Sequence, residues 1–176
     1  MISTVKTIHT LGPSNTNCES AARTWFKTNK IENGEIILYQ TLEDALEAMP
    51  KTEEHALLGC VVYPDLHSLV FSNLDKLKLA DVFIHNTYEM ILASRFNYIE
   101  DIKTVTSHPA PSGLISKNYK AIKIIHVNSN AQAAIDCVNG VSDGCITTMP
   151  AAISNKLNVI KNFGVVPMGF TIHVTK

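Results

Sequence analysis

The stretch Thr10-Leu11-Gly12-Pro13-Ser14-Asn15-Thr16 lies where the sequence changes from a strand pattern to a helix pattern. Residues 5–11 alternate apolar and polar side chains, which is typical of a half-buried strand, whereas apolar residues from Cys18 to Phe26 recur at helical spacing. Thr16-x-x-Glu19 predicts a capping box, in which the Thr16 hydroxyl accepts from the Glu19 amide and the Glu19 carboxylate accepts from the Thr16 amide. Backbone N–H groups at such a helix start can bind a carboxylate or phosphate, although the stretch also fits an ordinary turn of an α/β protein.

Length and charge limit the class of protein. The chain has 176 residues, of which 45% are hydrophobic and 18% are charged, as in an ordinary soluble globular protein. The formal net charge of −1 provides no basic field, so we expect no nucleic-acid partner. No apolar run approaches the roughly 20 residues of a membrane span, and the N-terminus lacks the apolar core of a signal peptide. We therefore expect no membrane partner and a cytoplasmic location.

The cysteines and histidines predict neither a metal site nor a cofactor. Cys18, Cys60, Cys137 and Cys145 show no C-x-x-C pair, and the seven histidines are scattered without a zinc pattern. The four cysteines are expected to be reduced, partly buried thiols.

Strand and helix patterns alternate along the chain. We predict helices at 42–49, after Pro111 to residue 119, after Ser129 and after Thr148, and Ser129-x-x-Gln132 predicts a second capping box. Residues 66–80 mix the two periods, and the strand at 88–94 can turn back on the strand at 81–86. The other predicted strands are 35–39, 56–63, 103–106, 121–127, 144–147, 159–163 and 168–174.

This alternation predicts parallel-type sheets with helices on both faces, whose ligands bind outside the carboxyl ends of the strands. Four strand-to-helix junctions carry hydroxyl or amide groups: Ser14-Asn15-Thr16, Ser107-His108, Ser129-Asn130 and Thr147-Thr148. If these junctions face one cleft, they form a polar pocket that accepts an anion with few formal charges. Ser107, Ser129 and Thr148 could instead serve only to cap helices.

Taken together, the junctions resemble those of the catalytic domain of prephenate dehydratases, in matching order over nearly the whole chain. The resemblance implies a two-lobed α/β fold like the type 2 periplasmic binding proteins, with the site in the cleft. We expect a single catalytic domain over 1–176, without a regulatory ACT domain, in which lobe 1 covers about 1–80 plus 163–176 and lobe 2 about 81–162. The matching segments are Gly12-Pro13, Ser107-His108-Pro109 and the stretch from Ala151 to Ile160.

The sequence departs from the dehydratase pattern near its C-terminus, where Pro167-Met168-Gly169-Phe170-Thr171 takes the place of a Thr-Arg-Phe signature. The Pro-x-Glu-Asn-Ser segment of that family is also replaced, by residues 61–68. The chain more closely resembles the prephenate decarboxylases of bacilysin biosynthesis, which likewise lack Thr-Arg-Phe. Asn15 stands at the first-turn glycine of the dehydratases, so we expect it to adopt the positive φ. The segments shared with the decarboxylases are Thr10–Pro13, Ser107–Pro111, Val127–Ser129, Gly140–Asp143 and Pro167-Met168.

The resemblance implies a carboxy-lyase that acts on prephenate, without making the ring aromatic, in secondary-metabolite or non-proteinogenic amino-acid biosynthesis. Such an enzyme must anchor the pyruvyl carboxylate, provide a poorly solvated place for the departing carboxylate, and keep acids away from the ring hydroxyl. Two alternatives remain open. One is a dehydratase with a divergent site, and the other is a non-catalytic protein that binds a small anion.

For catalysis we expect Ser107 and His108 to orient the substrate or relay a proton. The proton donor is open among His85, His108 and Tyr63, although His85 and Met168 also fit structural roles in apolar surroundings. The expected partner is a small-molecule substrate, prephenate or a related cyclic dicarboxylate, and the fold family admits a homodimer. The residues expected to bind the substrate are Ser14, Asn15, Thr16, Tyr63, His85, Ser129, Asn130, Thr147 and Met168.

Overall fold

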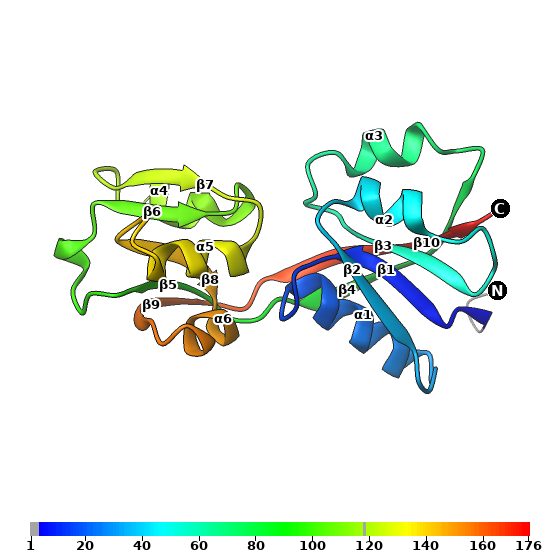
Figure 1. Cartoon of the computed structure of the whole chain (residues 1–176), viewed down its shortest axis with the longest axis horizontal. Helices are drawn as coiled ribbons and strands as arrows, with labels where there is room; N and C mark the ends of the chain where they lie inside the picture. Colours follow the sequence, from blue (N-terminus) through cyan, green and yellow to red (C-terminus); the bar gives the residue numbers. More distant parts are fainter. Residues whose placement is uncertain (1–3, 118) are drawn as a thin grey trace. The chain divides into compact units, whose positions relative to one another are not determined.

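The computed structural model describes residues 4–117 and 119–176 and divides into two compact units. Unit 1 comprises the described residues up to Asn86 together with Pro167–Lys176, and unit 2 comprises Thr87–Val166. The chain therefore passes between the units after Asn86 and after Val166. From the sequence, we expected the lobe boundaries at about residues 80 and 163. Each unit has its own five-stranded sheet (Figure 1).

The sheet of unit 1 has the strand order β2-β1-β3-β10-β4. Strands β1 (Thr7–Leu11), β2 (Glu35–Tyr39) and β3 (His55–Cys60) are parallel. Strand β10 (Pro167–Thr175) runs antiparallel to β3, and β4 (Leu77–Asn86) runs antiparallel to β10. Helix α1 (Asn17–Thr28) covers one face, and α2 (Leu42–Ala48) and α3 (Leu66–Phe71) cover the other (Figure 1).

Alternation along the strands decides which side chains lie under each helix of unit 1. Ile8 and Phe170 pack with Trp25 of α1, while Leu57 packs with Leu42 of α2 on the other face. Strand β3 is buried on both faces, which explains its continuous apolar run in the sequence. The strand ends at Cys60, three residues before the end of the predicted range.

The sheet of unit 2 has the strand order β7-β6-β8-β5-β9. Strands β6 (Thr104–Ser107), β7 (Lys123–His126) and β8 (Gly144–Thr148) are parallel, whereas β5 (Met90–Ser94) is antiparallel to both β8 and β9 (Asn158–Gly164). Helices α5 (Asn130–Val138) and α6 (Met149–Ser154) pack on one face. The other face carries α4 (Gly113–Ser116) and the short 3-10 helix η2 (Ile99–Asp101), and a second 3-10 helix, η3 (Ala110–Ser112), directly precedes α4.

Three expectations from the sequence are wrong in detail. Residues 88–94 do not turn back on the preceding strand, because β4 is an edge strand of unit 1 and β5 is buried between β8 and β9 in unit 2. The sheets are mixed, since β10 in unit 1 and β5 in unit 2 run antiparallel to both of their neighbours. The helix predicted after Pro111 is only the four-residue α4, in a segment where proline and glycine disfavour longer helices. The ambiguous segment 66–80 contains α3 and the start of β4.

Candidate functional site

The residues predicted for catalysis and binding in unit 2 lie at one edge of its sheet. Strand β6 ends at Ser107 and pairs with β7, which ends at His126, and with β8, which ends at Thr148. Helices α5 and α6 begin after β7 and β8, so their N-termini lie at the same edge. The structure thus brings together at this carboxyl edge Ser107, His108, Ser129, Asn130 and Thr147.

The start of α5 is capped by one side chain only. The Ser129 hydroxyl accepts a hydrogen bond from the Gln132 amide at 3.0 Å, as predicted. The Gln132 side chain donates to Asp136 at 2.7 Å instead of reaching back to Ser129, so the second capping box forms only in part. The first N–H groups of an α-helix have no partner within the helix, and this end of the nine-residue α5 therefore favours an anion.

Asn130 connects the start of α5 to the end of β8. Its backbone carbonyl accepts a hydrogen bond from Thr147 Oγ1 at 2.6 Å. Its side-chain Oδ1 is buried and has no hydrogen-bond partner within the described part of the chain. An unsatisfied buried polar group costs about 1–3 kcal/mol, so a polar group of a ligand would recover free energy here.

The contacts of His108 define the tautomer of its neutral ring. Its Nδ1 accepts from the backbone N–H of Ala110 at 3.3 Å, so the proton of the neutral ring is on Nε2. Burial, followed by the nearby His126, lowers the pKa of His108. The buried Ser107 hydroxyl donates to the carbonyl of His108 at 2.8 Å, which fixes the backbone of the motif.

In unit 1, the Glu19 carboxylate occupies the turn before α1, where we expected an anionic ligand to bind. Asn15 has a φ of 66°, which confirms the expected positive value. The Thr16 hydroxyl accepts from the Glu19 amide at 3.4 Å, but the Glu19 carboxylate accepts from Asn15 N at 2.6 Å, not from Thr16 as predicted. The positive φ turns the backbone so that the N–H of Asn15 meets the carboxylate. Ser14, Asn15 and Thr16 therefore lie at a helix start that Glu19 itself neutralises.

The other predicted residues of unit 1 divide between the two faces of the sheet. His85 pairs with Met168 across β4 and β10, and its Nε2 lies 3.0 Å from Ser20 Oγ of α1. Tyr63 packs with the core under α2 and donates from its hydroxyl to Glu43 at 2.5 Å. Burial lowers the pKa of His85, whereas burial and the hydrogen bond to Glu43 raise the pKa of Tyr63 to about 12. Tyr63 is therefore a poor acid at neutral pH.

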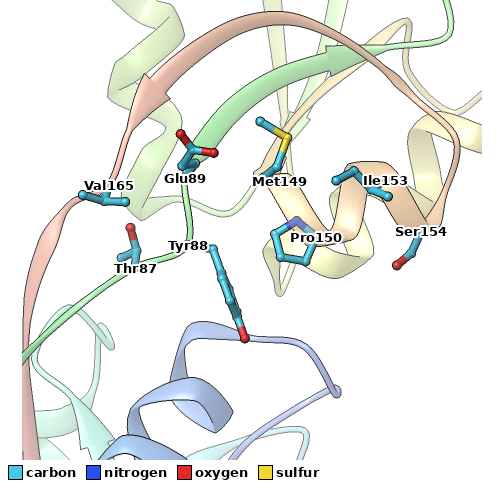
Figure 2. Close-up of a pocket in the computed structure, with 8 residues that line it drawn as sticks. All are labelled: Thr87, Tyr88, Glu89, Met149, Pro150, Ile153, Ser154 and Val165. Atoms are coloured by element: carbon cyan, nitrogen blue, oxygen red, sulfur yellow. The ribbon is translucent and has the colours of Figure 1, made fainter.

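A pocket of about 610 Å³ in unit 2 was not predicted from the sequence. It lies beside the start of α6, which begins at the carboxyl edge of β8, and its wall is mainly apolar (Figure 2). Glu89 contributes a carboxylate, whose Oε1 accepts from Asn162 Nδ2 at 3.0 Å. No motif indicates this pocket, because common apolar residues from distant segments form it. The lining residues are Thr87, Tyr88, Glu89, Met149, Pro150, Ile153, Ser154 and Val165.

The residues that the structure describes also bear on metal binding and on membrane insertion. Within 4–117 and 119–176, histidine, cysteine and carboxylate side chains form no group of three or more placed to hold a metal ion. None of the helices in these ranges combines the length and apolar character needed to cross a bilayer.

Comparison with known proteins identifies the family. The family model described as prephenate dehydratase matches residues 8–165. A prephenate decarboxylase of Bacillus subtilis is 30% identical over 182 residues, which cover 97% of this chain and 87% of that protein.

Solved structures show the same fold. A prephenate dehydratase from Arthrobacter aurescens in complex with L-Phe has a TM-score of 0.74 and 16% identity, and covers 97% of this chain. This chain spans only 60% of the length of that dehydratase. The periplasmic VFT2 domain of Bordetella pertussis BvgS has a TM-score of 0.60 and 15% identity, over 98% of this chain and 81% of that domain. The expected α/β fold of the periplasmic-binding-protein type is confirmed, and the chain belongs to the prephenate dehydratase family.

Proposed function

We propose that the protein is a prephenate decarboxylase, which releases CO2 while the ring keeps its hydroxyl and stays non-aromatic. The observation that carries the proposal is the likeness to a prephenate decarboxylase over 97% of the chain. The carboxyl edge of unit 2 supports it, because its five predicted site residues supply hydroxyl, amide and imidazole groups and no carboxylic acid. A dehydratase needs an acid beside the ring hydroxyl to help it leave, whereas this decarboxylase must keep acids away from that hydroxyl and supply a proton only to a ring carbon.

The N-terminus of α5 is the proposed anchor for the pyruvyl carboxylate. The helix dipole and the N–H groups of its first turn attract an anion without a formal positive charge. A half-turn of the Asn130 amide about its last side-chain bond would present an NH2 donor to this carboxylate where Oδ1 is now unpartnered. Thr147 fixes the first turn of α5 through its bond to the Asn130 carbonyl. Ser14, Asn15, Thr16, Tyr63, His85 and Met168 remain proposals as substrate-binding residues.

His108 is the proposed proton donor. When CO2 leaves, the electron pair of the broken bond moves into the ring, and a ring carbon must take up a proton. Protonation of Nδ1 would break the hydrogen bond from the Ala110 amide, and the imidazolium could then deliver a proton from Nε2 to the ring carbon. The lowered pKa of His108 means that the imidazolium is a minor form at neutral pH. The turnover number should therefore rise as the pH falls below about 6.5.

The first experiment incubates the purified protein with prephenate and follows CO2 release and ultraviolet absorbance. CO2 release without the enol absorbance of phenylpyruvate in alkali supports the decarboxylase. Phenylpyruvate formation above the spontaneous rate would identify a dehydratase instead. Saturable binding without turnover would identify an anion-binding protein, and no binding would reject prephenate as the ligand.

A pair of matched variants tests the anchor. Ser129→Ala removes the cap of α5, and Thr41→Ala removes the equivalent cap of α2, where Thr41 accepts from the Asp44 amide at 3.0 Å. Each change should cost about 1 kcal/mol of stability. Only Ser129→Ala should raise KM for prephenate, and an equal rise in both variants would contradict the anchor.

We further propose that the enzyme acts in the cytoplasm in the biosynthesis of a bacilysin-type antibiotic or a non-proteinogenic amino acid. No cofactor is proposed, because the ring itself takes up the electron pair of the broken bond and His108 supplies the proton. A homodimer remains a proposal, and gel filtration with light scattering would test it.

A further inference from the structure

The four cysteines form two close pairs, each made by one helix and one strand. In unit 1, Cys18 is the second residue of α1 and Cys60 is the last residue of β3, and both belong to the same buried core cluster, where their thiols interact. In unit 2, Cys137 of α5 and Cys145 of β8 form a similar pair. All four thiols are free. The sequence spacing does not reveal these pairs, because packing between distant elements creates them.

The two pairs differ in their access to solvent. Cys18 is 8% exposed and Cys60 is 7% exposed, whereas Cys137 and Cys145 are both fully buried. A small oxidant can therefore reach the pair in unit 1 with less opening of the protein than the pair in unit 2. Because both pairs consist of a helix thiol against a strand thiol, the second is an internal control for the first.

We propose that Cys18 and Cys60 are a redox modification site, at which peroxide converts two neighbouring thiols into a reversible disulfide. One thiolate attacks hydrogen peroxide, the O–O bond breaks, and a sulfenic acid and hydroxide form. The second thiol then attacks this sulfur, and the S–O bond breaks with release of water. The two sulfur atoms lose two electrons in total, and one peroxide becomes two water molecules. A dithiol reductant restores both thiols.

The environment of the pair indicates the order of attack. The hydrogen bond from the Cys18 thiol lowers the pKa of Cys60, and the same interaction raises the pKa of Cys18. Cys60 is therefore the thiolate that meets the peroxide, and Cys18 is the thiol that resolves the sulfenic acid. Cys18 also stands two residues after Thr16, so the disulfide would tie the start of α1 to the end of β3.

The test treats the intact protein with hydrogen peroxide, blocks the remaining thiols with an alkylating reagent, and maps the peptides by mass spectrometry. We expect a peptide pair linked through Cys18 and Cys60, which dithiothreitol separates. This linkage should form at least roughly tenfold faster than one between Cys137 and Cys145, since reactivity follows exposure. Linkage in unit 2 at the same rate, or sulfinic acid at Cys60 without linkage, would overturn the proposal.

Two variants assign the roles. Cys18→Ser leaves Cys60 without its resolving thiol, so peroxide should drive Cys60 to a sulfenic acid that a dimedone probe traps. Cys145→Ala should leave the linkage between Cys18 and Cys60 unchanged. Dimedone labelling of Cys18 in the intact protein, in place of Cys60, would reverse the assigned order and overturn that step. These readouts do not depend on turnover of prephenate.

Discussion

His9 should make the stability of unit 1 fall as the pH is lowered, and His9→Gln should remove most of that dependence. The His9 side chain lies in β1 and is 1% exposed. Its Nδ1 is 2.9 Å from the Tyr39 hydroxyl, and its Nε2 is 3.0 Å from Nδ1 of His55. Burial, and then the neighbouring His55, lower the pKa of His9 to about 4. Protonation of the His9 ring is therefore less favourable in the folded chain than in the unfolded chain.

The size and sign of the effect follow from proton linkage. The unfolded ring titrates at 6.5, so the pKa differs by about 2.5 units, which corresponds to about 3 kcal/mol. Between these values the unfolded state binds more protons than the folded state. The free energy of unfolding is thus highest above pH 6.5 and falls by up to about 3 kcal/mol as the pH drops towards 4.

The assay is urea denaturation across this pH window, followed by the fluorescence of Trp25. Trp25 is the single tryptophan and lies in α1, so the signal reports on unit 1. His9→Gln keeps a hydrogen-bonding side chain that does not titrate in this range. His126→Gln, at an exposed position of β7 in unit 2, is the matched control.

The wild type and the His126→Gln variant should lose stability in parallel, while His9→Gln should follow a flatter curve. A residual slope is expected from His173, whose pKa is also lowered by burial. An unchanged slope in His9→Gln, or a wild type that becomes more stable in acid, would refute the reasoning.

Three further changes test other parts of the molecule. Asp143→Ala should destabilise unit 2 by about 2–3 kcal/mol in urea titrations followed by circular dichroism, because the carboxylate accepts from two backbone amides and the Thr104 hydroxyl. Gly140→Ala should lower the melting temperature and cost about 1 kcal/mol, because the residue has a φ of 81° and a Cβ would meet only Arg95 at 3.8 Å. A disulfide between Cys18 and Cys60 closes a loop of about 40 residues and should raise the free energy of unfolding by about 4 kcal/mol, measured as a higher urea midpoint after oxidation.

Local signals predicted much of the fold. Thr16 and Ser129 accept from the amides three residues later, and their helices begin where the sequence indicates. Strand β2 has the predicted bounds, 35–39. The boundary between the two units was harder to predict, because residues 81–86 and 88–94 both have strand character. Which sheet each strand joins depends on pairing with segments far along the chain, such as β10 and β8.

The candidate site divides in the same way. The carboxyl edge of unit 2 could be located from the sequence, because each of its residues follows a recognisable strand. The directions of the side chains could not, since they depend on tertiary contacts. The Tyr63 hydroxyl contacts Glu43, and the His85 ring contacts Ser20 of α1. The two side chains therefore form their hydrogen bonds on different faces of the sheet in unit 1. The pocket with Glu89 has no local pattern at all.

The place of β10 in the first sheet has a consequence for synthesis on the ribosome. Among the described strands of that sheet, β4 lies at the edge and pairs with β10, which follows the whole of unit 2 in the chain. Unit 2 is continuous in sequence, so its segments have all emerged while unit 1 still lacks an inner strand. Synthesis from the N-terminus therefore favours folding of unit 2 first, because unit 1 cannot complete its sheet until β10 has been synthesised.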